Sequence, residues 1–91
     1  MSGGTRMKIL LYFDWNGTSK ELKEHDKKMA KSCLETGVEH EGLFGSMNEK
    51  WNYVWVFEAK GFEHFLEMSR KVPRPIHMSH YITELLMPIR L

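Results

Sequence analysis

Two segments of the chain are apolar at both odd and even positions, a pattern typical of strands that are covered on both faces. Residues 8–15 read KILLYFDW and end at the turn-forming pair Asn16 and Gly17. Residues 51–58 read WNYVWVFE and are equally rich in aromatic and β-branched side chains. The pattern predicts two central strands, each with a second apolar face that some further element must cover.

A helical pattern follows the first of these strands. Thr18, with Glu21 three residues later, is a capping-box signal for a helix that runs to residue 35 or 36, where Gly37 favours a left-handed end. The apolar residues that recur at helical spacing within it are Leu22, Met29 and Cys33. We therefore expect one amphipathic helix with a narrow apolar stripe.

A second helix is predicted to begin at Gly61 and to end near Lys71, because Pro73 and Pro75 cannot continue it. Its inward stripe is expected to consist of Phe62, Phe65, Leu66 and Ser69.

The two remaining strands are predicted at residues 38–44, which suit an edge, and at residues 80–87, which Pro88 closes. The element order is then βαββαβ, in which two right-handed split crossovers place both helices on one face of a four-stranded antiparallel sheet. The other face stays uncovered, although the central strands are apolar on it. The simplest cover is a second copy of the chain, so we expect a homodimer with an isologous contact.

In element order, length and the two-faced strands KILLYFDW and NYVWVFE, the sequence resembles the dimeric α/β-barrel superfamily. This superfamily includes antibiotic-biosynthesis-type monooxygenases, haem-degrading monooxygenases, muconolactone isomerases and small stand-alone domains of unknown function. The resemblance covers about residues 7–89 and implies an α+β, ferredoxin-like fold that pairs into a dimeric α/β barrel. It includes no catalytic signature, and a fold alone does not determine a function.

Some haem-degrading members of that superfamily use an asparagine on the first strand and a tryptophan and a histidine on or after the second helix. The comparable strand positions here hold Tyr12 and Asp14, the second helix has Phe65 in place of tryptophan, and only His77 could serve as the histidine. We therefore expect no tightly bound haem and no other cofactor.

Composition and charge narrow the class of protein. The 91 residues, 42% hydrophobic and 27% charged, suit one globular domain, which we place at residues 7–91 after an expression remnant or flexible leader of residues 1–6. The net charge of +1, with both signs interspersed, gives no bulk attraction to nucleic acid. No apolar run is long enough to span a membrane, and no secretory pattern opens the chain. The single cysteine, Cys33, excludes an internal disulfide and suits a reducing compartment, so we expect a cytoplasmic protein.

Six residues are candidates for a ligand-binding site: Tyr12, Asp14, His25, Tyr53, Trp55 and His77. The aromatic residues on the central strands form either a core or dimer interface, or an apolar pocket with polar handles. Asp14 could act as an acid or base if burial raised its pKa. His25 lies on the stripe of the first helix, either as a core residue or as a base that contacts a ligand.

No metal is expected, because His77 and His80 are three residues apart but would need a third ligand from elsewhere. The only local basic bias is Arg70, Lys71 and Arg74, which indicates a solvated loop or, alternatively, an anion site.

The leading functional hypothesis is a homodimer that binds a small apolar or aromatic molecule, in a cleft between helices and sheet or in the barrel. The first alternative is a cofactor-independent monooxygenase or isomerase. The second is an assembly module without any ligand. The sequence contains no nucleophile elbow, phosphate loop or dinucleotide fingerprint that would indicate another enzyme class.

Overall fold

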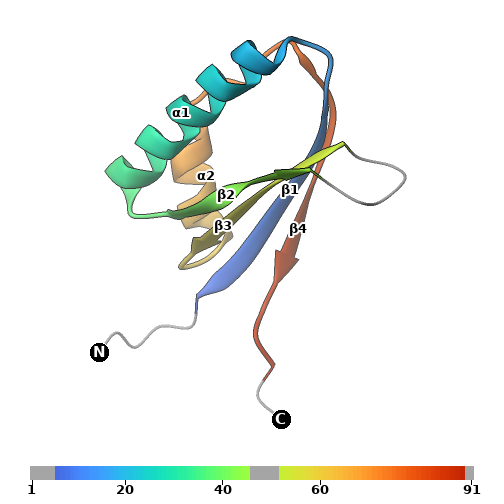
Figure 1. Cartoon of the computed structure of the whole chain (residues 1–91). Helices are drawn as coiled ribbons and strands as arrows, with labels where there is room; N and C mark the ends of the chain where they lie inside the picture. The colour runs from blue at the N-terminus through green and yellow to red at the C-terminus, as the bar shows by residue number, and fades with distance from the viewer. Residues whose placement is uncertain (1–5, 46–51, 90–91) are drawn as a thin grey trace.

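The computed structural model describes residues 6–45 and 52–89, and its element order is the predicted βαββαβ. The elements are β1 (Met7–Trp15), α1 (Ser19–Thr36), β2 (Glu39–Gly45), β3 (Tyr53–Ala59), α2 (Phe62–Arg70) and β4 (Met78–Leu86). The strands form one antiparallel sheet in the order β2-β3-β1-β4, so that β1 and β3 are central, as expected. Figure 1 shows both helices on the same face of this sheet.

Both predicted ends of α1 are confirmed. The hydroxyl of Thr18 accepts a hydrogen bond from the backbone N–H of Glu21 at 3.1 Å, and the Thr18 N–H donates to the Glu21 carboxylate at 2.8 Å. At the other end, Gly37 has a φ of 80° and donates its N–H to the carbonyl of Cys33. Only glycine adopts this left-handed conformation without steric cost, which explains why the helix stops there.

The structure shows which face of each central strand meets the helices. The odd-numbered side chains point into the core, where Ile9, Phe13 and Trp55 have no exposed surface. The even-numbered ones lie on the opposite face, where Leu10 pairs with Val56 in the β1–β3 register. No described element covers this second face, which we call the open face.

The open face has an apolar surface that reaches from one edge strand to the other. Its half-buried members lie on the central strands, and Phe44 on β2 and Ile82 on β4 are about half exposed, at 51% and 52%. The apolar residues on it are Leu10, Tyr12, Phe44, Val54, Val56, Ile82 and Leu86. A contiguous apolar surface of this extent is unusual on a soluble monomer.

Several element boundaries differ slightly from the prediction. β4 begins at Met78 rather than at residue 80, because a register shift after Asp14 lets Trp15 pair with Met78. β2 is displaced by one residue, to Glu39–Gly45. β3 begins at Tyr53, and the predicted start of that strand at Trp51 lies outside the described residues.

The prediction that Phe62 belongs to the inward stripe of α2 is wrong. This residue is 41% exposed, and Met68 is buried in its place beside Phe65. The reason is that α2 packs on β3 and extends one side of its surface, including Phe62, toward uncovered β4.

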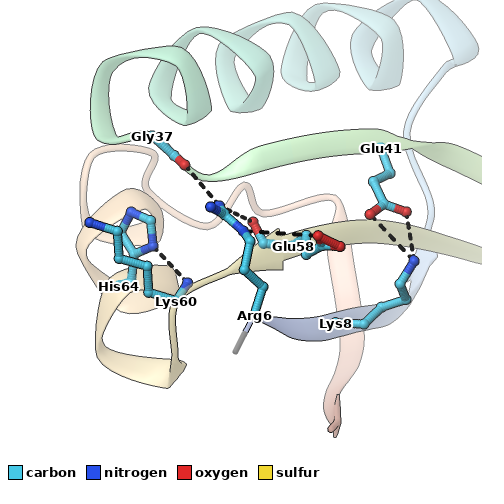
Figure 2. A network of polar contacts seen from close by, with 7 residues as sticks. All are labelled: Arg6, Lys8, Gly37, Glu41, Glu58, Lys60 and His64. Carbon is cyan, nitrogen blue, oxygen red and sulfur yellow. Dashed lines mark hydrogen bonds and ion pairs between the residues drawn. The ribbon is translucent and has the colours of Figure 1, made fainter. Parts of the chain in front are cut away.

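A network of polar contacts closes the end of the fold at which β1 begins (Figure 2). Arg6 donates to the carbonyl of Gly37 at 3.3 Å and lies 3.9 Å from the carboxylate of Glu58. Lys8 donates to Glu41 at 3.0 Å, which joins β1 to β2 across the open face. These contacts hold the end of α1, the edge strand and the central strands in one arrangement.

Candidate functional site

The two helices leave the inner face of β4 largely uncovered. α1 packs chiefly on α2 and β2, and α2 packs on β3. Tyr81 and Leu85 share the inner face with Phe13 and Ile9, their neighbours on β1, yet they are 49% and 42% exposed. Apolar inner-face side chains therefore border open space instead of a packed core.

Around Tyr81 this space is a cavity of about 500 Å³ between the helices and β4, which we call the apolar cavity. Its lining comes from both helices, the inner faces of β1 and β4, and the segment between α2 and β4. The lining residues are Leu11, His25, Met29, Phe62, Phe65, Leu66, Ser69, Arg70, Val72, Pro73, Arg74, Pro75, Met78, Tyr81 and Thr83. A mostly apolar lining with a few polar groups, at this volume, is typical of small-molecule sites.

The segment at residues 71–77 is held in place over the apolar cavity. Its buried Val72 donates its N–H to the carbonyl of Ser69 at 3.1 Å, and Asn16 donates to the carbonyl of His77 at 2.9 Å. The guanidinium carbon of Arg74 lies 4.9 Å from the centre of the Tyr81 ring, a cation–π contact. An exposed cation is thereby positioned at the rim of the cavity.

His25 is the one candidate from the sequence that lines the apolar cavity. It is only 8% exposed, and its ring lies 6.0 Å from that of Trp15 and 5.6 Å from that of Trp55. Among the described residues, the other four histidines have a polar partner and His25 has none. Burial first, and then the nearby Lys28 ammonium, lower the pKa of His25, so its imidazole is neutral at pH 7.

A second hollow of about 440 Å³ adjoins the apolar cavity, and we call it the basic cavity. The two share His25 and residues 72–75 as lining. The charged side chains around the basic cavity are Lys28, Lys31, Lys71, Arg74 and Glu35. Glu35 lies 3.6 Å from Lys71, so positive charge is in excess.

Trp55 and Tyr53 lie on the helix-facing side of β3 but belong to the core. Trp55 has no exposed surface, stacks on Phe13 at 4.2 Å and donates its indole N–H to Asp26 at 2.8 Å. The same Asp26 oxygen lies 2.8 Å from Nε2 of His40. The Tyr53 ring also stacks on that of Phe13, with ring centres 5.5 Å apart.

Tyr12 and Asp14 lie on the open face, away from both cavities. Tyr12 pairs with Val54 and Ile82 on the neighbouring strands. The Asp14 carboxylate accepts the backbone N–H of Asn52 at 3.1 Å at the end of β1.

His77 lies just before β4. Its Nε2 is 3.0 Å from the Glu21 carboxylate, and its ring is 5.4 Å from that of Trp15. The six candidates are thus distributed over four places: the lining of the apolar cavity, the core, the open face and the segment before β4. The expectation of no tightly bound haem stays a prediction.

Arg74, Tyr81 and Thr83 contribute to the cavities but were not among the site candidates. The sequence did single out Arg74, as part of a basic segment with an anion site as one alternative. Tyr81 and Thr83 occupy odd-numbered positions of the predicted last strand, as Leu85 does, so the sequence places all three on one face of that strand. That signal indicates a face of a strand, but not whether a helix covers it.

Two other groups with chemical potential lie outside these cavities. Burial raises the pKa of the Cys33 thiol to about 11, so the thiolate is scarce at neutral pH. Glu39, Glu41 and Glu58 form the only set of three potential metal ligands that the described residues bring within reach of one another. Ion pairs with Lys8 and Arg6 offset part of that negative charge.

Comparison with known proteins identifies the fold and no family. No model of a known protein family matches the sequence, and no curated protein matches it either. A dimeric ferredoxin-like protein of unknown function from Thermobifida fusca aligns with a TM-score of 0.66 at 10% identity, over 97% of this chain and 95% of that one.

Two further structures are similar. A chlorite dismutase variant from Candidatus Nitrospira defluvii gives a TM-score of 0.66 at 15% identity over 96% of this chain, which spans only 42% of that enzyme. A DABB family protein with a ferredoxin-like fold from Mesorhizobium loti gives 0.54 at 12% identity, over 94% of this chain and 99% of that one. The ferredoxin-like fold predicted from the sequence is therefore confirmed. Within the described residues, neither helix has the length and apolar character needed to cross a membrane.

Proposed function

We propose that this ferredoxin-like chain is a homodimer that binds a small apolar or aromatic molecule in the apolar cavity between the helices and β4. The observation that supports the binding role is the cavity of about 500 Å³, whose mostly apolar lining includes the half-exposed inner-face residue Tyr81. A ligand that removed this surface from water would gain roughly 25 cal/mol for each Å² it buried.

The test is binding of a neutral apolar fluorophore, 1-aminoanthracene, followed by its emission in the presence of the protein. Wild-type protein should enhance the emission with a saturable curve. Thr83→Phe, which places a phenyl ring in the apolar cavity, should abolish the effect. Thr83→Val has nearly the size of the native side chain and should leave it intact. Equal binding by Thr83→Phe and Thr83→Val would contradict a site in this cavity.

The dimer is proposed from the open face. Central-strand side chains such as Leu10 and Val56 are apolar there, and no described element packs on them. A second copy of the sheet would cover this surface, and two such faces together bury on the order of 1,200–2,000 Å², the size of a specific interface. The similar Thermobifida fusca protein is dimeric, which agrees with this proposal.

A second candidate function is proton transfer by His25 in a cofactor-independent oxygenase or isomerase. Its neutral ring in an apolar cavity has an acceptor nitrogen that no described residue occupies. Such an enzyme should accelerate the loss of deuterium from the central carbon of 1-phenyl-1,3-butanedione, as followed by NMR. Exchange no faster with wild type than with His25→Gln would argue against this function.

A further inference from the structure

We infer that the molecule bound in the apolar cavity carries an oxyanion at one end, and that His25 and Arg74 hold this group where the apolar cavity meets the basic cavity. The inference rests on the proposed function and specifies the chemical class of its ligand. The chemistry is that of a carboxylate or a phosphate joined to an apolar chain or ring.

The position of the oxyanion follows from the residues that the two cavities share. His25 and residues 72–75 line both hollows. A molecule that fills the apolar cavity therefore ends against these residues, with the basic side chains beyond them. Its apolar part contacts Met29, Phe65 and Tyr81, and its polar end faces His25 and Arg74.

His25 lacks a hydrogen-bond partner in this position. A neutral imidazole offers one N–H donor and one acceptor nitrogen, and no group among the described residues pairs with either nitrogen of His25. The other histidines of the chain satisfy this need within the fold, for example His40 with Asp26 and His64 with the carbonyl of Thr36. An oxyanion accepts the N–H of His25 and supplies the missing partner.

Arg74 supplies positive charge on the lining that the two cavities share. Its guanidinium is exposed but rests against the Tyr81 ring, so its position is restrained before any ligand arrives. A planar guanidinium binds carboxylate and phosphate through paired N–H donors. The excess of lysines around the basic cavity adds a favourable potential for an anion and an unfavourable one for a cation.

The ionisation of His25 gives this inference a pH signature. In the free protein, burial and Lys28 lower its pKa, whereas a bound oxyanion would raise it. The complex then holds a proton more firmly than the free protein, so the anion binds more tightly as the pH falls. The charged groups that act on the imidazole are Lys28 and Asp26 on α1, and Arg74 lines the same cavity. The flanking indoles of Trp15 and Trp55 are uncharged.

Titration calorimetry with decanoate, decyl phosphate and decanol, each below its micellar concentration, tests the inference. We expect both anions, or the one that fits, to bind at least about tenfold more tightly than the alcohol near pH 6. For decanoate, which keeps a single negative charge over this range, the advantage should shrink toward about pH 8, whereas the affinity for decanol should stay constant. The ratio of the two anions identifies the preferred headgroup.

Three variants test which residues cause the tighter binding of the anion. Arg74→Gln, at an exposed position where folding is not at risk, should lower the affinity for the anion about tenfold and leave decanol unchanged. His25→Gln keeps a hydrogen-bonding side chain but should remove the pH dependence. Lys23→Gln is the matched control, since it removes a positive charge from α1 at a residue that lines neither cavity.

Equal affinity for decanol and for both anions would overturn the oxyanion inference and leave the proposed binding of an apolar molecule standing. The oxyanion inference is also wrong if Arg74→Gln and Lys23→Gln weaken the anion equally, because the effect would then be one of general charge. If none of the three compounds binds, both the inference and the proposed function are wrong.

Discussion

Asp26 is the hydrogen-bond partner of two side chains at the helix–sheet interface, Trp55 and His40. One of its oxygens accepts the indole N–H of Trp55 and lies 2.8 Å from Nε2 of His40. Trp55 is fully buried, and the Asp26 carboxylate is the acceptor of its indole N–H. Asp26 therefore fixes the orientation of the tryptophan that flanks His25.

Asp26→Ala should lower the free energy of unfolding by about 2 kcal/mol, because it leaves the buried Trp55 N–H without an acceptor. Glu24→Ala, an exposed substitution on the same helix, is the control and should change stability by less than about 0.5 kcal/mol. Urea unfolding followed by tryptophan fluorescence measures both. Equal stability of the two variants would show that the Asp26–Trp55 contact contributes nothing.

At the scale of elements, the start of α1 is tied to the segment that enters β4. Glu21 takes part in the capping box with Thr18 and also lies 3.0 Å from His77. The hydrogen bonds from Thr18, and to a smaller extent His77, lower the pKa of Glu21. The ionised carboxylate is thus the form that the fold favours, and its contribution to stability is lost only as the pH falls below its ordinary value of 4.5.

Thr18→Ala removes the side-chain cap of α1 and should destabilise the protein by about 1 kcal/mol. Ser19→Ala, the next residue and the first of the helix, removes a hydroxyl for which the structure shows no capping role and should be neutral. Thermal unfolding by circular dichroism compares the two. If the side-chain cap contributed nothing to stability, the two variants would unfold at the same midpoint temperature.

At the scale of the whole molecule, a charge placed on one face of β3 should have a different effect from a charge placed on the other face. Val54 lies on the open face between Tyr12 and Phe44, whereas Trp55 lies in the core. Val54→Asp should yield a folded monomer, because it places a charge in the proposed dimer interface. Trp55→Asp should prevent folding, because an unpaired buried charge costs several kcal/mol.

Light scattering and circular dichroism at several concentrations distinguish these outcomes, with Val54→Thr as a control of the same size. Wild type and Val54→Thr should have the mass of a dimer. A wild-type protein that stayed monomeric at high micromolar concentration would exclude the barrel. It would leave a monomeric domain whose open face serves another partner.

The order of elements, the caps of α1 and the central place of β1 and β3 were predictable from the sequence. Each depends on residues close together in the chain, such as Thr18 with Glu21, or on apolar patterns within one strand. The sequence also indicated that a second sheet face needs a cover. These features follow from local backbone geometry and side-chain periodicity, which a sequence displays directly.

The tertiary structure alone decided which face of β3 meets the helices and which candidates share a site. Trp55 and Val54 are both apolar neighbours on one strand, and only packing against Asp26 and Phe13 assigns Trp55 to the core. The cavities exist because the helices pack on β2 and β3 and leave β4 uncovered. His25 and Arg74 line the same two cavities because of this lateral placement of whole elements, which depends on long-range packing that no local pattern encodes.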